Sequence, residues 1–197
     1  MINKVTYQLT EHNFYPEVYQ KTQIVIGHNG RKDMRHYYGW LNRRNGKYKK
    51  TASYSIDKDG TIYEHYDPKY YSDFLGNEQD KCNISVVLVN EGWLKLNDVN
   101  VFVDWLGHTY SKSIEPLNRN WRNYKYWSKY TDKQIESLNY LTEYLCNEFN
   151  IEKNSIGHNV YDENVDLFKG ITFRSNYYKD ITDVSPAFEF EKLLQNG

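Results

Sequence analysis

The feature that most constrains the fold is the segment NISVVLVNEG, residues 83–92, the most apolar stretch of the chain. A run of apolar, mainly β-branched residues without polar alternation is typical of a central strand that is covered on both faces. A shorter run of the same kind, QIVIG, occupies residues 23–27 and predicts a second buried strand. Two strands of this type favour a sheet enclosed between other layers.

The clearest helix is predicted by residues 130–151, YTDKQIESLNYLTEYLCNEFNI. Thr131 and Gln134 have the spacing of a capping box, and apolar residues follow at intervals of three or four. Lys58-Asp59-Gly60 separates two alternating segments, 52–56 and 61–64, as the turn of a hairpin does. Strands interleaved with helices predict a single α/β domain over residues 1–197, with a core at about 20–190 and a central mixed β-sheet flanked by helices.

The composition excludes several classes of function. The 197 residues carry a formal charge of −1, which gives no overall attraction to nucleic acid or to a membrane surface. The basic segment RRNGKYKKT (43–51) is therefore interpreted as a solvated loop. No run of eighteen apolar residues and no apolar signal segment occurs, so we expect a cytoplasmic protein without a membrane partner.

The tetrapeptide Ile-Gly-His-Asn occurs twice, at residues 26–29 and 156–159, which raises the question of whether His28 and His158 bind one metal ion. The first copy continues into HNGRKDMRHYYGW (28–40), where cations stand beside aromatic rings. Such a segment suits an anionic ligand with a flat or sugar group. In the alternative, the segment starts a helix whose aromatic residues pack inward while its cations are solvated.

The order of these elements resembles the zinc-dependent N-acetylmuramoyl-L-alanine amidases, which share their fold with peptidoglycan recognition proteins and phage amidase-type lysozymes. The resemblance runs from TQIVIGHNG to SPAF, that is, over residues 22–188. NISVVLVNEG is similar to the family's Ser-Ile-Gly-Ile-Glu-Leu-Val-Asn-x-Gly strand. The final segment YKDITDVSPAF is similar to its closing Lys-x-Asp-Pro-Gly-Pro-x-Phe. SYSIDKDGTIYEHYDPKYY resembles its second strand and hairpin.

The resemblance implies a zinc ion held by two histidines and a third ligand, with an open position where water is activated. In this register His158 takes the place of the second histidine and Asp183 that of the third ligand. The family's first histidine corresponds to Gly27, and His28 follows one place later. Because side chains alternate across a strand, that slip turns His28 to the opposite face unless the strand bulges at Gly27.

Three other positions depart from the family pattern. The glutamate of its central strand corresponds to Val87, the lysine before the third ligand to Ile181, and a loop histidine to Phe74. The sequence therefore lacks a ligand, a proton-transfer group and an oxyanion donor at positions where catalysis uses them. We interpret the twin motifs as a coincidence in which only His158 lies in register with a ligand.

We therefore expect a non-catalytic binder that holds a small anionic ligand, either a muropeptide or a nucleotide-like signal, in the former catalytic cleft and needs no zinc. The alternative is an active zinc amidase, for example a phage endolysin, with His158, Asp183 and a shifted His28 as metal ligands. The predicted ligand-binding residues are His28, Asn29, Arg31, Arg35, Tyr54, Asn90, Trp93, His158, Asn159 and Asp183.

Overall fold

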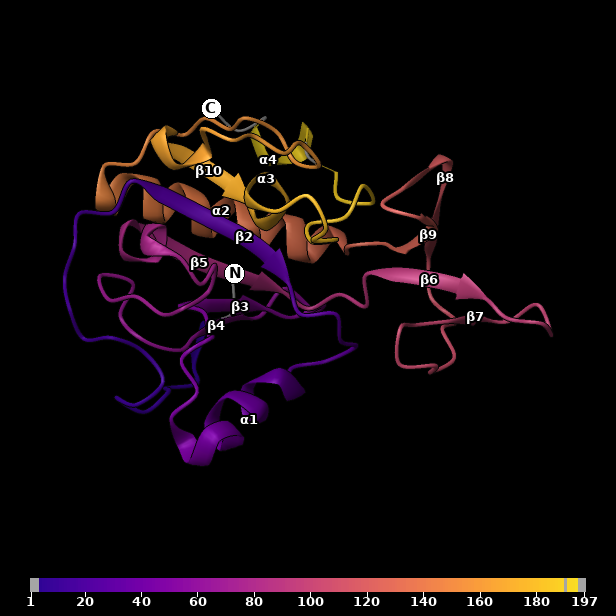
Figure 1. Cartoon of the computed structure of the whole chain (residues 1–197), viewed down its shortest axis with the longest axis horizontal. Helices are drawn as coiled ribbons and strands as arrows, with labels where there is room; N and C mark the ends of the chain where they lie inside the picture. Colours follow the sequence, from indigo (N-terminus) through magenta and orange to yellow (C-terminus); the bar gives the residue numbers. More distant parts are fainter. Residues whose placement is uncertain (1–3, 190, 195–197) are drawn as a thin grey trace.

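The two apolar runs form adjacent parallel strands at the centre of the main sheet. The structure is a computed structural model that describes residues 4–189 and 191–194. Six strands pair in the order β1-β4-β3-β5-β2-β10, and the sheet is mixed because β3 and β4 are antiparallel (Figure 1). The strands are β1 (Lys4–Thr6), β2 (Gln23–His28), β3 (Tyr54–Ile56), β4 (Ile62–Glu64), β5 (Asn83–Leu88) and β10 (Gly170–Phe173).

Helix α2 (Asp132–Phe149) covers one face of this sheet. Its N-terminus is closed by the predicted capping box, in which the Thr131 hydroxyl accepts the Gln134 N–H and the Gln134 side chain accepts the Thr131 N–H. Its C-cap, Asn150, adopts the left-handed conformation that ends many helices. The Gln134 amide also donates to the carbonyls of Ile56 and Val89, which ties the first turn of the helix to the sheet. Apolar side chains from the inner face of α2 and from alternate sheet positions then make one buried cluster.

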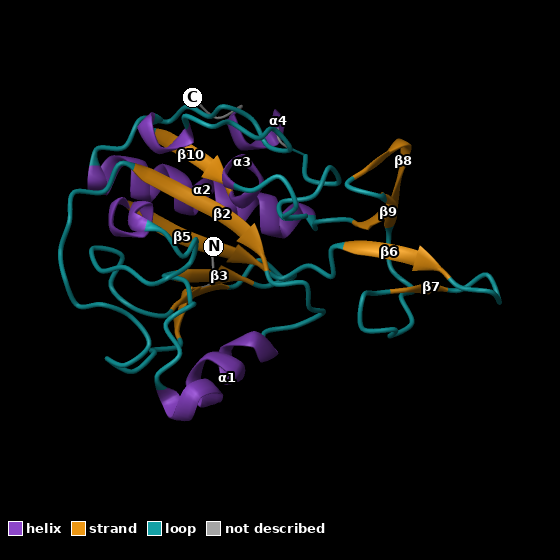
Figure 2. Ribbon diagram, in the orientation of Figure 1, coloured by secondary structure: helices purple, strands orange, loops and turns teal. Residues whose placement is uncertain are grey.

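The opposite face carries helix α1 (Arg35–Asn42) and a second apolar cluster, which includes Val25, Val87 and Trp40. Figure 2 shows α1 on the side of the sheet away from α2. Trp40 is buried, but Tyr38 is 59% exposed, so the interpretation of all the aromatic residues of this segment as inward-facing is wrong for Tyr38. Helix α1 therefore packs on the sheet through the face that carries Trp40, while Tyr38 faces outward.

A second sheet extends away from the main one and was not anticipated by the sequence. It has the order β7-β6-β9-β8 and joins the end of β5 to the start of α2. Trp127 is fully buried at its base. Its strands are β6 (Trp93–Leu96), β7 (Phe102–Val103), β8 (Ile114–Trp121) and β9 (Tyr124–Ser128). The remaining helical segments are η1 (Arg43–Gly46), η2 (Glu78–Cys82), η3 (Val165–Leu167), α3 (Arg174–Tyr177) and α4 (Glu191–Leu194).

The predicted α/β fold with a mixed central sheet and flanking helices is confirmed. Strand β5, helix α2 and the β3–β4 hairpin lie within a few residues of their predicted bounds. Within the part of the chain that the structure describes, no helix is both long and apolar enough to cross a membrane.

Leu138 provides a test of the core, because its side chain is fully buried between α2 and the sheet. Leu138→Ala should lower the free energy of unfolding by about 3–4 kcal/mol through lost transfer energy and a cavity. Tyr140→Ala in the same helix, where the side chain is 55% exposed, is the control and should change it by less than about 0.5 kcal/mol. Urea unfolding followed by circular dichroism measures both, and equal losses would contradict the assigned helix face.

Candidate functional site

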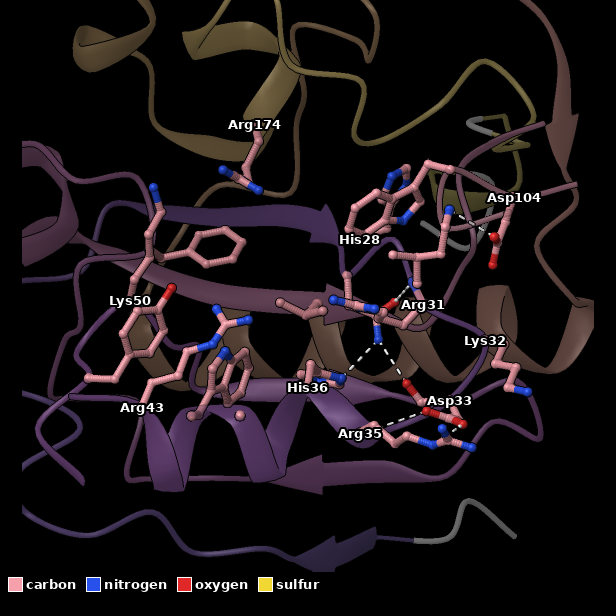
Figure 3. Close-up of a pocket in the computed structure, with 18 of the residues that line it drawn as sticks. His28, Arg31, Lys32, Asp33, Arg35, His36, Arg43, Lys50, Asp104 and Arg174 are labelled. Atoms are coloured by element: carbon pink, nitrogen blue, oxygen red, sulfur yellow. Dashed lines mark hydrogen bonds and ion pairs between the residues drawn. The ribbon is translucent and has the colours of Figure 1, made fainter. Parts of the chain in front are cut away.

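A cavity of about 560 Å³ lies where the parallel strands β2 and β5 end. Ligands of α/β proteins bind at this edge of a sheet because loops and helix ends meet there. Helix α1 forms one wall, and the end of β2 and Arg174 form another (Figure 3). Residues 104–106 and 108 form the third wall; they belong to the second sheet and its loops, residues 93–128, here called the extension. Parts of the chain that are far apart in sequence therefore share one concave surface.

The cavity concentrates positive charge in a chain whose net charge is −1. Two carboxylates line it. Asp33 pairs with Arg35 at 3.0 Å, and Asp104 accepts the backbone N–H groups of Leu106 and His108. Six cationic side chains also line it: Arg31, Lys32, Arg35, Arg43, Lys50 and Arg174. This excess of cations over carboxylates favours an anionic occupant.

Gly27 lies at the centre of a row formed by neighbouring strands. It pairs with Val87 of β5, and because Phe173 pairs with Ile26, Arg174 follows opposite Gly27 on the other side. A Cβ atom at residue 27 would stand 2.6 Å from Asp183 Oδ2 and 2.7 Å from Arg174 Cδ. The space that a side chain at residue 27 would fill is therefore occupied by Arg174 and Asp183.

Arg174 and Asp183 form a largely buried ion pair. Nη1 of Arg174 lies 3.0 Å from Oδ2 of Asp183, and these side chains are 18% and 7% exposed. The same oxygen accepts the backbone N–H of His28 at 3.1 Å. The guanidinium lies over the ring of Phe74, with Cζ 5.3 Å from the ring centroid. Both charges thus have partners, which a buried ion pair requires to be tolerated.

The ring of His28 points away from this pair. Strands β2 and β5 pair residue for residue up to His28 and Leu88, so β2 runs to its end without a bulge. Nδ1 of His28 lies 2.8 Å from the Tyr130 hydroxyl, on the side of the sheet that α2 covers. The Ser185 N–H donates to that hydroxyl oxygen, which leaves the hydroxyl hydrogen free for Nδ1. Burial lowers the pKa of His28, so the ring is held neutral.

Comparison with known proteins identifies the family. Residues 18–167 match the family described as N-acetylmuramoyl-L-alanine amidase. This chain belongs to that amidase family. No curated protein sequence matches the chain significantly.

Solved amidase structures share the fold. The amidase LysC from Clostridium intestinale is 14% identical, with a TM-score of 0.54 over 98% of this chain and 94% of that one. A selenomethionine derivative of AmpD is 13% identical, with a TM-score of 0.54 over 98% and 92%. The catalytic domain of XlyA is 10% identical, with a TM-score of 0.52 over 93% and 90%. At these identities the likeness concerns the fold alone.

The amidase family implies a zinc ion, and the side chains around residue 27 do not fit one. Gly27 offers no donor atom, and a guanidinium such as that of Arg174 has only N–H donors and a positive charge. Zinc in proteins is held by imidazole, thiolate and carboxylate groups. Among the described residues, no group of three or more His, Cys, Asp or Glu side chains could hold a metal ion.

The predicted ligand-binding residues do not all meet at the cavity. His28, Asn29, Arg31 and Arg35 line it, and Asp183 adjoins it through Arg174. Tyr54 is buried in the core on the α2 side, and Trp93 stacks on Tyr124 in the extension, with ring centroids 4.2 Å apart. Asn90 holds the chain beside Ser128 by donating to its carbonyl oxygen. Only part of the predicted set thus forms one surface.

The second Ile-Gly-His-Asn lies in the loop that precedes β10. The ring of His158 packs against Phe173 and Phe188, with centroids 5.8 and 5.7 Å away. Burial lowers the pKa of His158 to about 4. Asn159 has a left-handed backbone with φ of 65°. His158 thus lies among aromatic rings.

Several lining residues were missed by sequence reasoning. The interpretation of residues 43–51 as a solvated loop is incomplete, because Arg43 and Lys50 line the cavity. Trp105 belongs to the unanticipated extension, and its indole N–H donates to the Gly30 carbonyl at 2.6 Å. Arg174 carried one usable signal, since it directly follows the short apolar run Ile-Thr-Phe at 171–173.

A directed chain of hydrogen bonds lies beneath the cavity and fixes two histidine tautomers. His65 Nδ1 faces the Tyr7 carbonyl oxygen at 2.9 Å and must carry the hydrogen, so Nε2 accepts from the Ser55 hydroxyl at 2.8 Å. Nε2–H of His36 then donates to Ser55 at 3.0 Å, and its Nδ1 accepts from the Asn29 amide at 2.8 Å. Burial lowers the pKa of His36 to about 4 and that of His65 to about 3.

Gly27→Ala should strain the Arg174–Asp183 pair, because the new Cβ would overlap both side chains. We expect the free energy of unfolding to fall by about 1–3 kcal/mol, as for other overpacked sites. Gly39→Ala is the matched control, since its Cβ would meet nothing nearer than 3.7 Å and it lies in a helix, where alanine stabilises by about 1 kcal/mol. Chemical denaturation measures both. An unchanged free energy of unfolding in Gly27→Ala would show that Arg174 and Asp183 can move aside without cost.

The buried histidines predict a loss of stability in acid. Their folded-state pKa values lie below the ordinary value of 6.5, so the unfolded chain binds protons between pH 6.5 and 4 that the folded chain does not. The free energy of unfolding should be independent of these histidines above pH 6.5. Below that pH it should fall by about 1.4 kcal/mol per pH unit for each such histidine. His65→Gln should flatten that slope, measured by urea unfolding at several pH values. The same flattening in His12→Gln, at an exposed position, would count against this origin.

Proposed function

We propose that this protein is a non-catalytic member of the amidase family that binds a small anionic ligand in the cavity at the end of β2. The observation that carries the proposal is the position of the Arg174 guanidinium. It fills the space beside Gly27, in the place of the family's first histidine, and it pairs with Asp183, in the place of the third ligand. A fixed organic cation stands where the family's metal would need neutral or anionic donors.

The loss of catalytic groups supports the same conclusion. Hydrolysis of an amide by this family's chemistry needs activated water, a proton-transfer group and a donor for the oxyanion. Val87 and Phe74 present apolar side chains at two of the corresponding positions, and both are buried. Loss of a single oxyanion donor typically costs about a hundredfold or more in turnover. The losses in turnover from several such groups are not additive. What matters is therefore which catalytic groups are missing, and not a total loss in turnover.

Ligand binding requires fewer specific groups than catalysis does, and the cavity has the groups that binding requires. A concave site with convergent polar groups suffices for recognition. The Asn29 amide is held in one orientation, because its oxygen accepts the N–H groups of Arg31 and Asn90 at 3.0 and 3.1 Å. Around it stand cations that bind carboxylate or phosphate oxygens. The amidase family's own substrates, muramoyl peptides, and nucleotides both carry such anionic groups.

The alternative, a working zinc amidase with His28 as a shifted ligand, has less support. A shifted ligand at residue 28 requires a bulge in β2, whereas the strand keeps a regular register with β5. The His28 ring is hydrogen-bonded to the Tyr130 hydroxyl, on the α2 side of the sheet. Asp183 Oδ2 lies on the other side, where it accepts the backbone N–H of His28 and does not bond to the ring. This alternative is therefore kept as an outcome of the test.

The test combines a turnover assay with calorimetry on the whole chain. With zinc supplied, no peptide should be released from muramoyl peptides, while an anionic ligand from a panel of muramoyl peptides, nucleotides and pyrophosphate should bind. Arg174→Ala should weaken that binding about ten- to a hundredfold, because a charged hydrogen bond contributes about 1.5–3 kcal/mol. Arg119→Ala, at an exposed position of β8, should leave it unchanged.

Arg174→Lys guards against a folding artefact, since it keeps a charge beside Asp183 while removing the planar fork. Its binding should fall between those of the parent and Arg174→Ala. Release of peptide from muramic acid that is abolished by His28→Ala would establish the zinc amidase instead. Binding of no member of the panel would equally overturn the proposal.

A further inference from the structure

The cavity has two distinct ends, set by helix α1. Arg35, His36, Gly39 and Trp40 line it from one face of the helix, and Arg43 lines it as the residue that caps the end of the helix. At 1.5 Å of rise per residue, Arg35 and Arg43 are about 12 Å apart along the helix axis. A ligand that lies along this wall therefore meets two separate groups of side chains.

The end of the cavity nearest Arg43, here called the inner end, carries three of the six lining cations. Arg43, Lys50 and Arg174 come from three separate segments of the chain, and all three lie in the left half of Figure 3, with Arg174 above Arg43. The Arg43 guanidinium lies against the Tyr48 ring, 5.4 Å from its centroid. Within residues 4–189 and 191–194, neither Arg43 nor Lys50 forms a salt bridge with a carboxylate. Three cations in the lining of one end, with one carboxylate partner among them, suit a group that bears more than one negative charge, such as phosphate.

The outer end offers a planar surface. The Trp105 indole reaches back from the extension, is fixed by its bond to the Gly30 carbonyl, and remains 44% exposed. The Arg31 guanidinium lies 4.9 Å from the centroid of that ring. An exposed, anchored indole next to a planar cation is the kind of platform on which a nucleobase stacks. Its bond to Gly30, five residues before Arg35, places it beside the segment that leads into α1, whereas Arg43 caps the far end of that helix.

Gly39 lies between the two ends and is not required there by the fold. Glycine inside a helix costs about 1 kcal/mol relative to alanine. A Cβ atom at residue 39 would meet only the Arg43 side chain, at 3.7 Å, so neither packing nor backbone conformation demands glycine. Its consequence is a bare stretch of helix facing the cavity, which lets a flat or bulky group approach the backbone closely.

We propose that the ligand is a nucleotide with at least two phosphate charges, whose phosphates bind Arg43, Lys50 and Arg174 and whose base stacks on Trp105. This inference rests on the proposed function and names the ligand class of the same site. The lining carries six cations against two carboxylates, which matches the charge density of phosphates better than the dispersed carboxylates of a muramoyl peptide. Linear nucleoside diphosphates and cyclic dinucleotides share this chemistry.

The test is calorimetry on the full chain with ADP, cyclic di-AMP, adenosine, pyrophosphate and a muramoyl tripeptide. At least one of the two nucleotides should bind ten times more tightly than pyrophosphate, adenosine or the tripeptide. Trp105→Ala should weaken nucleotide binding about five- to a hundredfold, the range seen when a stacking ring is removed, and leave pyrophosphate binding unchanged. Lys50→Ala should weaken both, whereas Lys47→Ala, in the same loop but outside the lining, should weaken neither.

Gly39→Ala separates a binding effect from a folding effect. It should raise the resistance of the chain to urea while lowering nucleotide affinity at least several-fold. Equal binding of pyrophosphate and both nucleotides, or tighter binding of the tripeptide, would overturn the nucleotide assignment and leave the proposed anion-binding function intact. Failure of every anion to bind would overturn both.

Discussion

The ion pair between Arg174 and Asp183 is the interaction on which the site depends. It exists because residue 27 has no side chain. A Cβ there would stand within 2.7 Å of both partners, so the glycine and the pair require one another. The pair also anchors three parts of the chain, since Asp183 accepts the His28 N–H at the end of β2 and Arg174 begins directly after β10. Removing either partner would leave a buried charge without compensation.

This arrangement explains how an amidase-family fold can present a positive cavity in a chain of nearly neutral charge. The parallel strands β10, β2 and β5 end together and bring residues 174, 27 and 87 side by side. That row consists of a cation, a glycine whose side-chain space is filled by Arg174 and Asp183, and an apolar side chain. The extension after β5 adds Trp105 as a third wall. The same framework therefore carries a group of cations and an exposed indole at one cavity.

A buried polar network beneath the cavity holds the residues of its wall in place. His36, Ser55 and His65 are linked so that each donor has one acceptor, and the chain ends at the Asn29 amide. Such a network is rigid because every member would lose a partner if one moved. It fixes Asn29 and the start of α1, and hence the wall that carries Arg35, Gly39 and Arg43. Its cost is sensitivity to acid, since both rings are held neutral by burial.

The sequence by itself determined the layers of the fold and the departures from the family's pattern. An apolar run such as residues 83–88 and a capped, periodic helix such as Asp132–Phe149 carry their structure in local chemistry, and Gly27, Val87 and Phe74 are read directly from the chain. Only the tertiary structure decided which groups fill the resulting space. Arg174 and Trp105 reach the cavity through strand pairing and a bonded loop between residues far apart in sequence. No local pattern encodes such contacts, because they depend on how distant segments pack.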